Sequence, residues 1–165
     1  MFDDHIELGI MIEVPSAALL IKDFADEVDF LSIGTNDLIQ YMLAVDRGND
    51  IVTLQYQEFH PSIIRTLFFI ISEAKKANTN VTLCGEMAAD FRAIPLLLGL
   101  GLESISVSGA AIPYAKSIIR SLDYSMIQDL AAECLKFKTE KEIHDKVNKF
   151  YFANFGDKSH EFYSS

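Results

Sequence analysis

Residues 30–37 read Phe30-Leu31-Ser32-Ile33-Gly34-Thr35-Asn36-Asp37. The apolar run predicts a buried strand, and the glycine with short polar residues after it predicts the end of that strand and the start of a helix. The stretches on either side are similar. Residues 8–13 form an apolar run that ends in a carboxylate and is stopped by Pro15, and residues 81–85 form a run that ends at a glycine. The sequence therefore predicts strands that are each followed by a polar turn and a helix.

A fourth strand is expected at residues 104–108, where serines alternate with apolar residues. Helices are expected after Gly34 and at residues 17–24, 63–77, 92–100, 112–122, 124–137 and, more weakly, 139–150. This alternation of apolar strands with helices predicts a parallel sheet covered by helices on both faces. Two α/β architectures fit, a doubly wound sheet and a (β/α)8 barrel, of which four strands would be half. We assign residues 1–150 to one domain and 151–165 to a frayed C-terminal tail.

Composition narrows the possible partners and location. The chain has 165 residues and a formal net charge of −10, which argues against nucleic acid or an anionic membrane surface as a partner. The two cysteines, Cys84 and Cys134, lack the spacing of a zinc site or a disulfide framework, and this favours a reducing compartment. The start of the sequence is acidic, unlike a signal peptide, and no apolar run approaches the roughly 20 residues that span a bilayer. A cytoplasmic protein is expected.

Glu13, Asp37 and Cys84 lie at or just after the carboxyl ends of three successive predicted strands. In parallel α/β folds ligands bind outside these strand ends, so the three side chains are candidates for one site. Two carboxylates suit Mg²⁺, which takes water and substrate oxygens as its other ligands. The alternatives are that Glu13 is a solvated strand end and that Asp37 caps the next helix, and both interpretations can hold together.

Residues 34–37 also place a glycine turn before a helix N-terminus, where free amides and the helix dipole favour an anion such as phosphate. Arg47 lies ten residues after Asp37 in the sequence, and its guanidinium could make paired hydrogen bonds to phosphate. The alternative for Arg47 is a surface ion pair with Asp46 or Asp50. Cys84 is either part of the site or a small buried hydrophobic residue, and Cys134 is expected to be core.

Three segments together resemble the phosphoenolpyruvate-utilising enzyme family: GIMIEVP (residues 9–15), FLSIGTNDLIQYMLAVDRGND (30–50) and VTLCGEMAAD (81–90). SISVSGAAIP (104–113) and VNKF (147–150) look closest to its enzyme I branch, which serves the bacterial sugar phosphotransferase system. The resemblance covers nearly the whole chain. It implies a (β/α)8 TIM barrel of the phosphoenolpyruvate/pyruvate type, of which this chain would be the C-terminal half, strands five to eight with their helices.

The resemblance also implies roles for individual residues. Glu13 and Asp37 match the family's magnesium ligands, Asn36, Asp37 and Arg47 match its substrate contacts, and Cys84 matches the cysteine that exchanges a proton with the enolate carbon. The implied reaction is Mg²⁺-dependent transfer of a phosphoryl group from phosphoenolpyruvate to a histidine on another domain, with release of pyruvate. The implied partners are a histidine-containing phosphocarrier protein and a second copy in a homodimer.

No segment of the sequence matches the family's histidine domain or the arginines of the first half of its barrel. We therefore expect a fragment that does not turn over alone. Three alternatives are a fragment of pyruvate phosphate dikinase or phosphoenolpyruvate synthase, a carbon–carbon lyase on a related barrel, and a non-catalytic piece that dimerises or docks on a partner.

Overall fold

The fold is organised around a parallel sheet of four strands. The computed structural model describes residues 5–46, 48 and 55–156. Within them, β1 (Gly9–Ile12), β2 (Phe30–Gly34), β3 (Asn80–Cys84) and β4 (Ser104–Ile105) pair in the order β1-β2-β3-β4, and every pair is parallel. The prediction of a parallel α/β sheet is confirmed. The fourth strand is shorter than expected, because pairing with β3 is limited to two positions, Thr82 with Ser104 and Leu83 with Ile105.

The strand order decides between the two architectures left open by the sequence. A doubly wound sheet reverses its strand order at a switch point, whereas successive strands of a barrel follow one another around the sheet. The order here is sequential and has no reversal among the described strands. The doubly wound arrangement is therefore not the one observed. The four strands form an open sheet, however, and no closed barrel is present in the described part of the chain.

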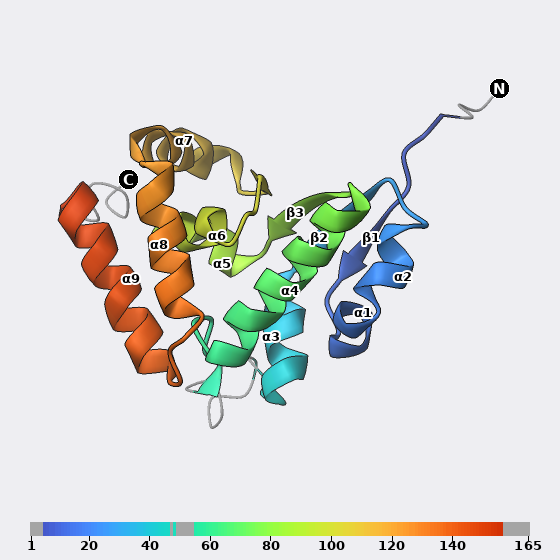
Figure 1. The fold of residues 1–165 in the computed structure, drawn as a ribbon, viewed down its shortest axis with the longest axis horizontal. Coiled ribbons are helices and arrows are strands. Elements are labelled where there is room, and N and C mark those ends of the chain that lie inside the picture. The colour runs from blue at the N-terminus through green and yellow to red at the C-terminus, as the bar shows by residue number, and fades with distance from the viewer. Residues whose placement is uncertain (1–4, 47, 49–54, 157–165) are drawn as a thin grey trace.

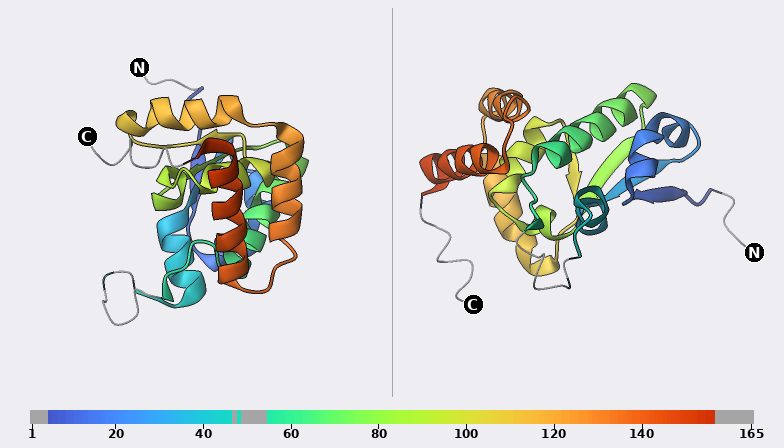
Figure 2. Two further views of the ribbon diagram at one scale, coloured as in Figure 1. Left: turned by 90° about the vertical axis from the view of Figure 1, so that its left-hand side faces the viewer. Right: turned by 90° about the horizontal axis from the view of Figure 1, so that it is seen from below.

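The helices follow the strands in the expected alternation (Figure 1). Their bounds are α1 (Pro15–Leu19), α2 (Ile21–Ala25), α3 (Thr35–Leu43), α4 (Pro61–Ala77), α5 (Glu86–Ala89), α6 (Ala93–Gly99), α7 (Ile112–Ser121), α8 (Tyr124–Cys134) and α9 (Glu140–Phe155), with a 3₁₀ turn at Gly109–Ala111. The views in Figure 2 show α7, α8 and α9 gathered at the end of the molecule away from β1.

Several helices differ from the sequence prediction, and α8 ends at Cys134 and not at residue 137. The single helix expected at residues 17–24 is two short helices, because the backbone leaves helical geometry at Leu20. The short helix α5 was not foreseen. Helix α9 continues past residue 150 to Phe155, with Tyr151 buried, so the segment expected to be a frayed tail begins as helix. A capping box between Thr139 and Glu142 starts α9, and buried residues on its inner face extend it.

The two faces of the sheet are unlike. Leu31, Ile33 and Leu83 are fully buried on one face, where α4 contacts β3 and packs against α2. On the other face Met11 is 49% exposed and Phe30 is 37% exposed. The expectation that helices cover both faces is wrong. The physical reason is that right-handed crossovers between sequentially ordered parallel strands place every connecting helix on the same side of the sheet.

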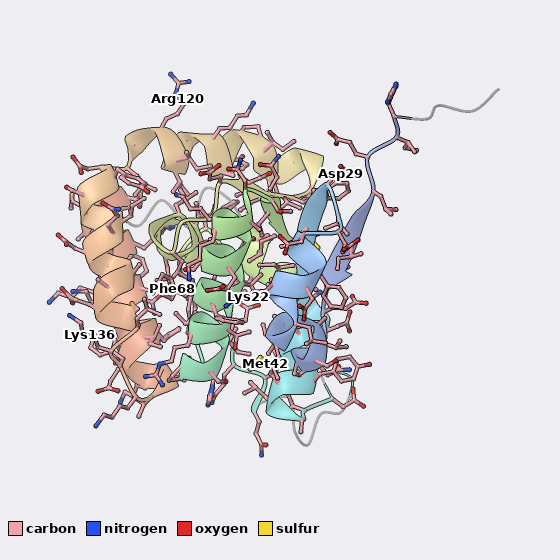
Figure 3. The ribbon with its side chains drawn as sticks, turned by 45° about the vertical axis from the view of Figure 1, so that its right-hand side comes forward. Lys22, Asp29, Met42, Phe68, Arg120 and Lys136 are labelled. Atoms are coloured by element: carbon pink, nitrogen blue, oxygen red, sulfur yellow. The ribbon has the colours of Figure 1, made fainter. Side chains whose placement is uncertain are left out.

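A buried carboxylate that pairs with two exposed lysines supports the helix layer. Glu73 of α4 is 8% exposed and lies 3.4 Å from the ammonium of Lys22 on α2, which Figure 3 labels, and 2.6 Å from that of Lys76. The hydrogen bond from Lys76 holds the pKa of the Glu73 carboxyl below its usual value. Apolar packing and the ion pair between Lys22 of α2 and Glu73 of α4 therefore hold the covered face. The candidate site is sought on the open face.

Candidate active site

Two of the predicted site residues flank Gly34 at the carboxyl edge of the sheet. Gly34 ends β2, and Cys84, which ends β3, is its partner across the ladder. On the other side of Gly34, a Cβ atom at that position would lie 3.2 Å from Oε2 of Glu13 and 3.0 Å from Sδ of Met11. Glu13 and Cys84 therefore lie on either side of one glycine, and the absence of a side chain there leaves room for the Glu13 carboxylate.

Asp37 enters from the first turn of α3, which starts directly after β2. The N-cap position of α3 is Gly34, and no side chain makes a capping hydrogen bond there. The alternative interpretation of Asp37 as the helix cap is therefore wrong. Asp37 is half-buried in this first turn, where the helix dipole favours negative charge.

Glu13 follows β1 and Asp37 follows β2, and carboxylates at these strand ends are the residues that could hold a hard divalent cation. The described residues contain no group of three or more histidine, cysteine or acidic side chains placed to share a metal ion. A site of two carboxylates still fits Mg²⁺, which commonly takes one or two protein carboxylates and completes its octahedron with water and substrate oxygens.

Thr35 and Asn36 bind the turn that follows Cys84. The Thr35 hydroxyl donates to the Cys84 carbonyl over 2.8 Å, and Oδ1 of Asn36 accepts from the Glu86 amide over 2.8 Å. The residue between them, Gly85, has φ +105°. Since the Asn36 oxygen is engaged with Glu86, its amide N–H groups are what it can offer to an anion.

The Cys84 thiol is half-buried and weakly held. It donates to the Ile33 carbonyl over 3.5 Å and lies 3.9 Å from the Ser32 hydroxyl. Cys134 differs, because it is 1% exposed in the core and burial raises the pKa of its thiol to about 11. The prediction of Cys134 as a core residue is confirmed, and Cys84 is the more exposed of the two cysteines.

A carboxyl group that sequence reasoning missed lies beside the same turn. The pKa of Glu58 is raised to about 7, chiefly by burial and also by the nearby carboxylates of Asp90 and Glu86, while Arg92 opposes the rise. Arg92 is itself paired with Asp90, through Nε at 2.9 Å and Nη2 at 2.7 Å. The sequence contains no signal for this cluster, because residues 58, 86 and 90 come together only through the fold.

The predicted phosphate contact Arg47 lies outside the described residues, as does Asp50. Asp46, the other acidic residue proposed to pair with Arg47, accepts a hydrogen bond from the Gly48 amide at 2.8 Å. The placement of Arg47 therefore stays a prediction.

A cavity of about 690 Å³ lies at the opposite edge of the sheet, near the starts of β2, β3 and β4. Its lining includes Phe30, Asn80 and Ser104 together with Lys75 and Glu103. None of the predicted site residues reaches it. Ligands of parallel sheets bind at the carboxyl ends of the strands, so this cavity is not the candidate site.

These features define an α/β protein that presents two carboxylates, a helix N-terminus and a thiol at the carboxyl edge of a parallel sheet. Comparison with known families agrees, since residues 1–124 match the model described as "PEP-utilising enzyme, PEP-binding domain". The chain belongs to this family of phosphoenolpyruvate-utilising enzymes.

Among curated proteins the chain is similar to several described as phosphoenolpyruvate-protein phosphotransferase. It is 50% identical to the one from Listeria monocytogenes over 147 residues, which is 89% of this chain and 26% of that protein. It is 47% identical to the one from Buchnera aphidicola subsp. Schizaphis graminum over 150 residues, 91% of this chain and 26% of that protein. It is 42% identical to the one from Haemophilus influenzae over 154 residues, which is 93% of this chain and 27% of that protein. The chain thus spans about a quarter of the length of these relatives.

Among the helices that the structure describes, none combines the length and the apolar character needed to cross a membrane.

Proposed function

We propose that this chain is the C-terminal half of the phosphoenolpyruvate-binding (β/α)8 barrel of a phosphoenolpyruvate-protein phosphotransferase, contributing strands five to eight. The family match and the identities of 42–50% to proteins of that name support the proposal. So does the strand order, which continues in sequence as in a barrel. The observation that carries it is the approach of Glu13 and Cys84 to the two sides of Gly34 at the carboxyl edge.

In the proposed reaction the phosphoryl group leaves the enol oxygen of phosphoenolpyruvate for a histidine on another domain. Glu13 and Asp37 would hold Mg²⁺, which when bound neutralises charge on the substrate carboxylate and phosphate. The amides at the start of α3 and the Asn36 side chain donate to phosphate oxygens, and Arg47 contributes a paired contact. Breaking the P–O bond leaves the enolate of pyruvate, whose methylene carbon takes the proton of the Cys84 thiol.

Turnover is proposed to need parts of the protein that correspond to the remainder of the relatives' length. The histidine that accepts the phosphoryl group and the arginines of the first half of the barrel would lie there. The acceptor after that histidine is proposed to be a phosphocarrier protein, and the location cytoplasmic. The curated names favour this reading over a dikinase or synthase, because they specify a protein as the phosphoryl acceptor.

The test is Mg²⁺-dependent binding of oxalate, a planar dianion that mimics the pyruvate enolate, measured by calorimetry. The chain is titrated alone and after mixing with the remaining part of the Listeria relative. Glu13→Gln and Asp37→Asn are expected to weaken binding by about tenfold or more, whereas Glu7→Gln, at an exposed position before β1, changes it less than about twofold. Absence of Mg²⁺-dependent binding even in the mixture would refute the proposal.

A second candidate function is that of a non-catalytic piece that dimerises. An apolar cavity of about 330 Å³ between α1, α3 and α4 favours it, with Leu19 76% exposed and Phe69 37% exposed on its lining. Met42, labelled in Figure 3, belongs to the same lining. Sedimentation separates the two candidates. A dimer that Phe69→Ser dissociates without loss of oxalate binding would support both roles, and a dimer without any binding would leave only assembly.

A further inference from the structure

Residues from α3 hold the backbone on both sides of Gly85. The Thr35 hydroxyl donates to the carbonyl before Gly85, that of Cys84, and the Asn36 side chain accepts from the amide after it, that of Glu86. Thr35 is 0% exposed. The turn that directly follows the thiol is therefore held from a neighbouring element, in addition to the bond that the Ala88 amide of α5 donates to the Gly85 carbonyl over 3.2 Å.

Position 85 has no room for a side chain between Thr35 and Asn36. Its φ of +105° and ψ of −172° belong to a region that only glycine adopts readily. A Cβ atom there would lie 2.3 Å from Oγ1 of Thr35 and 2.7 Å from Oδ1 of Asn36. The hydrogen bonds of Thr35 and Asn36 on either side of Gly85 therefore form a clamp. This clamp sets the direction in which the chain leaves β3.

The side chain of Cys84 is held far less firmly than its backbone. A thiol is a weak donor, and its contacts with the Ile33 carbonyl and the Ser32 hydroxyl are long, at 3.5 Å and 3.9 Å. The bond from Thr35 to the Cys84 carbonyl is a normal hydrogen bond of 2.8 Å. The position of the thiol is thus determined mainly by the backbone at Cys84.

We propose that Thr35 is a positioning residue for Cys84. Its hydroxyl fixes the Cys84 carbonyl, so that the thiol stays at the open edge beside Gly34, where Glu13 also lies. The hydroxyl is buried and already donates, so the Thr35 side chain acts through Cys84 and not on a substrate. The catalytic consequence rests on the proposed function, while the effect on the thiol does not.

Thr79 provides a matched control. Its hydroxyl donates to the Ala25 carbonyl, also over 2.8 Å, but just before β3 begins, at the opposite edge of the sheet. Thr79→Val removes the same kind of bond as Thr35→Val. If loss of any such bond loosened the whole chain, the two substitutions would change Cys84 equally.

The first measurement is the rate at which iodoacetamide alkylates Cys84 in the folded chain, where Cys134 is buried. Thr35→Val is expected to raise this rate by about fivefold, because the unanchored strand end opens more often. Thr35→Ser keeps the hydroxyl and is expected to retain the wild-type rate, as is Thr79→Val. An unchanged rate in Thr35→Val, or an equal rise in Thr79→Val, would overturn the proposal. If Thr35→Val does not fold, Thr35→Ser decides, because a rate raised fivefold despite the retained hydroxyl contradicts the proposed role.

The second measurement uses the chain mixed with the remaining part of the Listeria relative. Exchange of deuterium into the methyl group of pyruvate is expected to lose about tenfold in kcat in Thr35→Val, with KM changed less than about twofold. Recovery in Thr35→Ser distinguishes positioning from general packing. If no variant, the wild type included, exchanges deuterium or binds oxalate, the proposed function fails and the alkylation rates alone decide the role of Thr35.

Discussion

Replacing Gly85 with alanine is expected to be among the more damaging single-methyl changes in this chain. The backbone at Gly85 has φ +105°, which strains any residue with a Cβ atom. The new atom would also lie 2.3 Å from the Thr35 hydroxyl and 2.7 Å from the Asn36 amide oxygen. Thr35 is fully buried, so it cannot turn away into solvent.

The expected cost has two parts. Backbone strain at such a position costs about 1 to 3 kcal/mol. Displacing Thr35 and Asn36 breaks the hydrogen bonds to Cys84 and Glu86, at about 1 kcal/mol each. The free energy of unfolding of Gly85→Ala is therefore expected to fall by about 3 to 5 kcal/mol.

Gly101→Ala is the control, measured by urea unfolding followed by circular dichroism. Gly101 has φ +98°, but the nearest atom to an added Cβ, Cγ2 of Ile71, is an ordinary 3.5 Å away. Only backbone strain applies there, so the two variants should differ by about 2 kcal/mol, or about 1 M in urea midpoint for a slope of about 2 kcal/mol per M. Equal midpoints would show that the contact with Thr35 and Asn36 carries no energy, and the proposed clamp would be refuted.

Gly34→Ala should push the Glu13 carboxylate away and weaken Mg²⁺-dependent oxalate binding by about tenfold, as measured by calorimetry. The free energy of unfolding, measured in urea, should change by less than about 1 kcal/mol. Glu58 has a folded pKa of about 7 against an ordinary 4.5, chiefly because it is buried, so it destabilises the chain increasingly as pH rises from about 4.5 to about 7. In urea unfolding, Glu58→Gln should therefore be more stable than the wild type at pH 8, by about 1 to 2 kcal/mol after allowing for partial exposure. At pH 4 the two proteins should be nearly equal in stability. Equal stabilities at pH 8 would contradict this prediction. Thiol titration should find one reactive group, Cys84, in the folded chain and two in denaturant, because Cys134 is buried with a pKa of about 11; rapid reaction of both in native buffer would contradict the burial.

The sequence predicted the first three strands well because each is a short, largely apolar run followed by a clear break, whereas the fourth is shorter than expected. Gly34 and Gly85 mark the ends of β2 and β3 where they were expected. Long-range geometry was less accessible. Helices on both faces were expected from the apolar strands, yet Met11 and Phe30 lie on an open face, because which face the crossovers cover depends on strand order, and local periodicity does not encode that order.

The candidate site was predictable to the extent that it depends on strand ends. Glu13 and Cys84 meet at Gly34 because parallel strands bring their carboxyl ends to one edge, which is a property of the topology and needs no side-chain detail. Glu58 could not be found in this way. Its perturbed carboxyl depends on burial and on charges distant in sequence, and neither is visible in a linear pattern.

The junction of β2 and α3 ties the proposed metal ligands to the thiol. Gly34 leaves space for the Glu13 carboxylate, the next residue anchors the Cys84 carbonyl, and Asp37 follows two positions later in the same helical turn. Any shift of this first turn of α3 would move Asp37 and the anchor of Cys84 together, because both belong to one rigid backbone segment. In the proposed reaction Asp37, which would hold Mg²⁺ with Glu13, and the thiol that donates the proton therefore keep a fixed relative position, as general acid catalysis on a bound substrate requires.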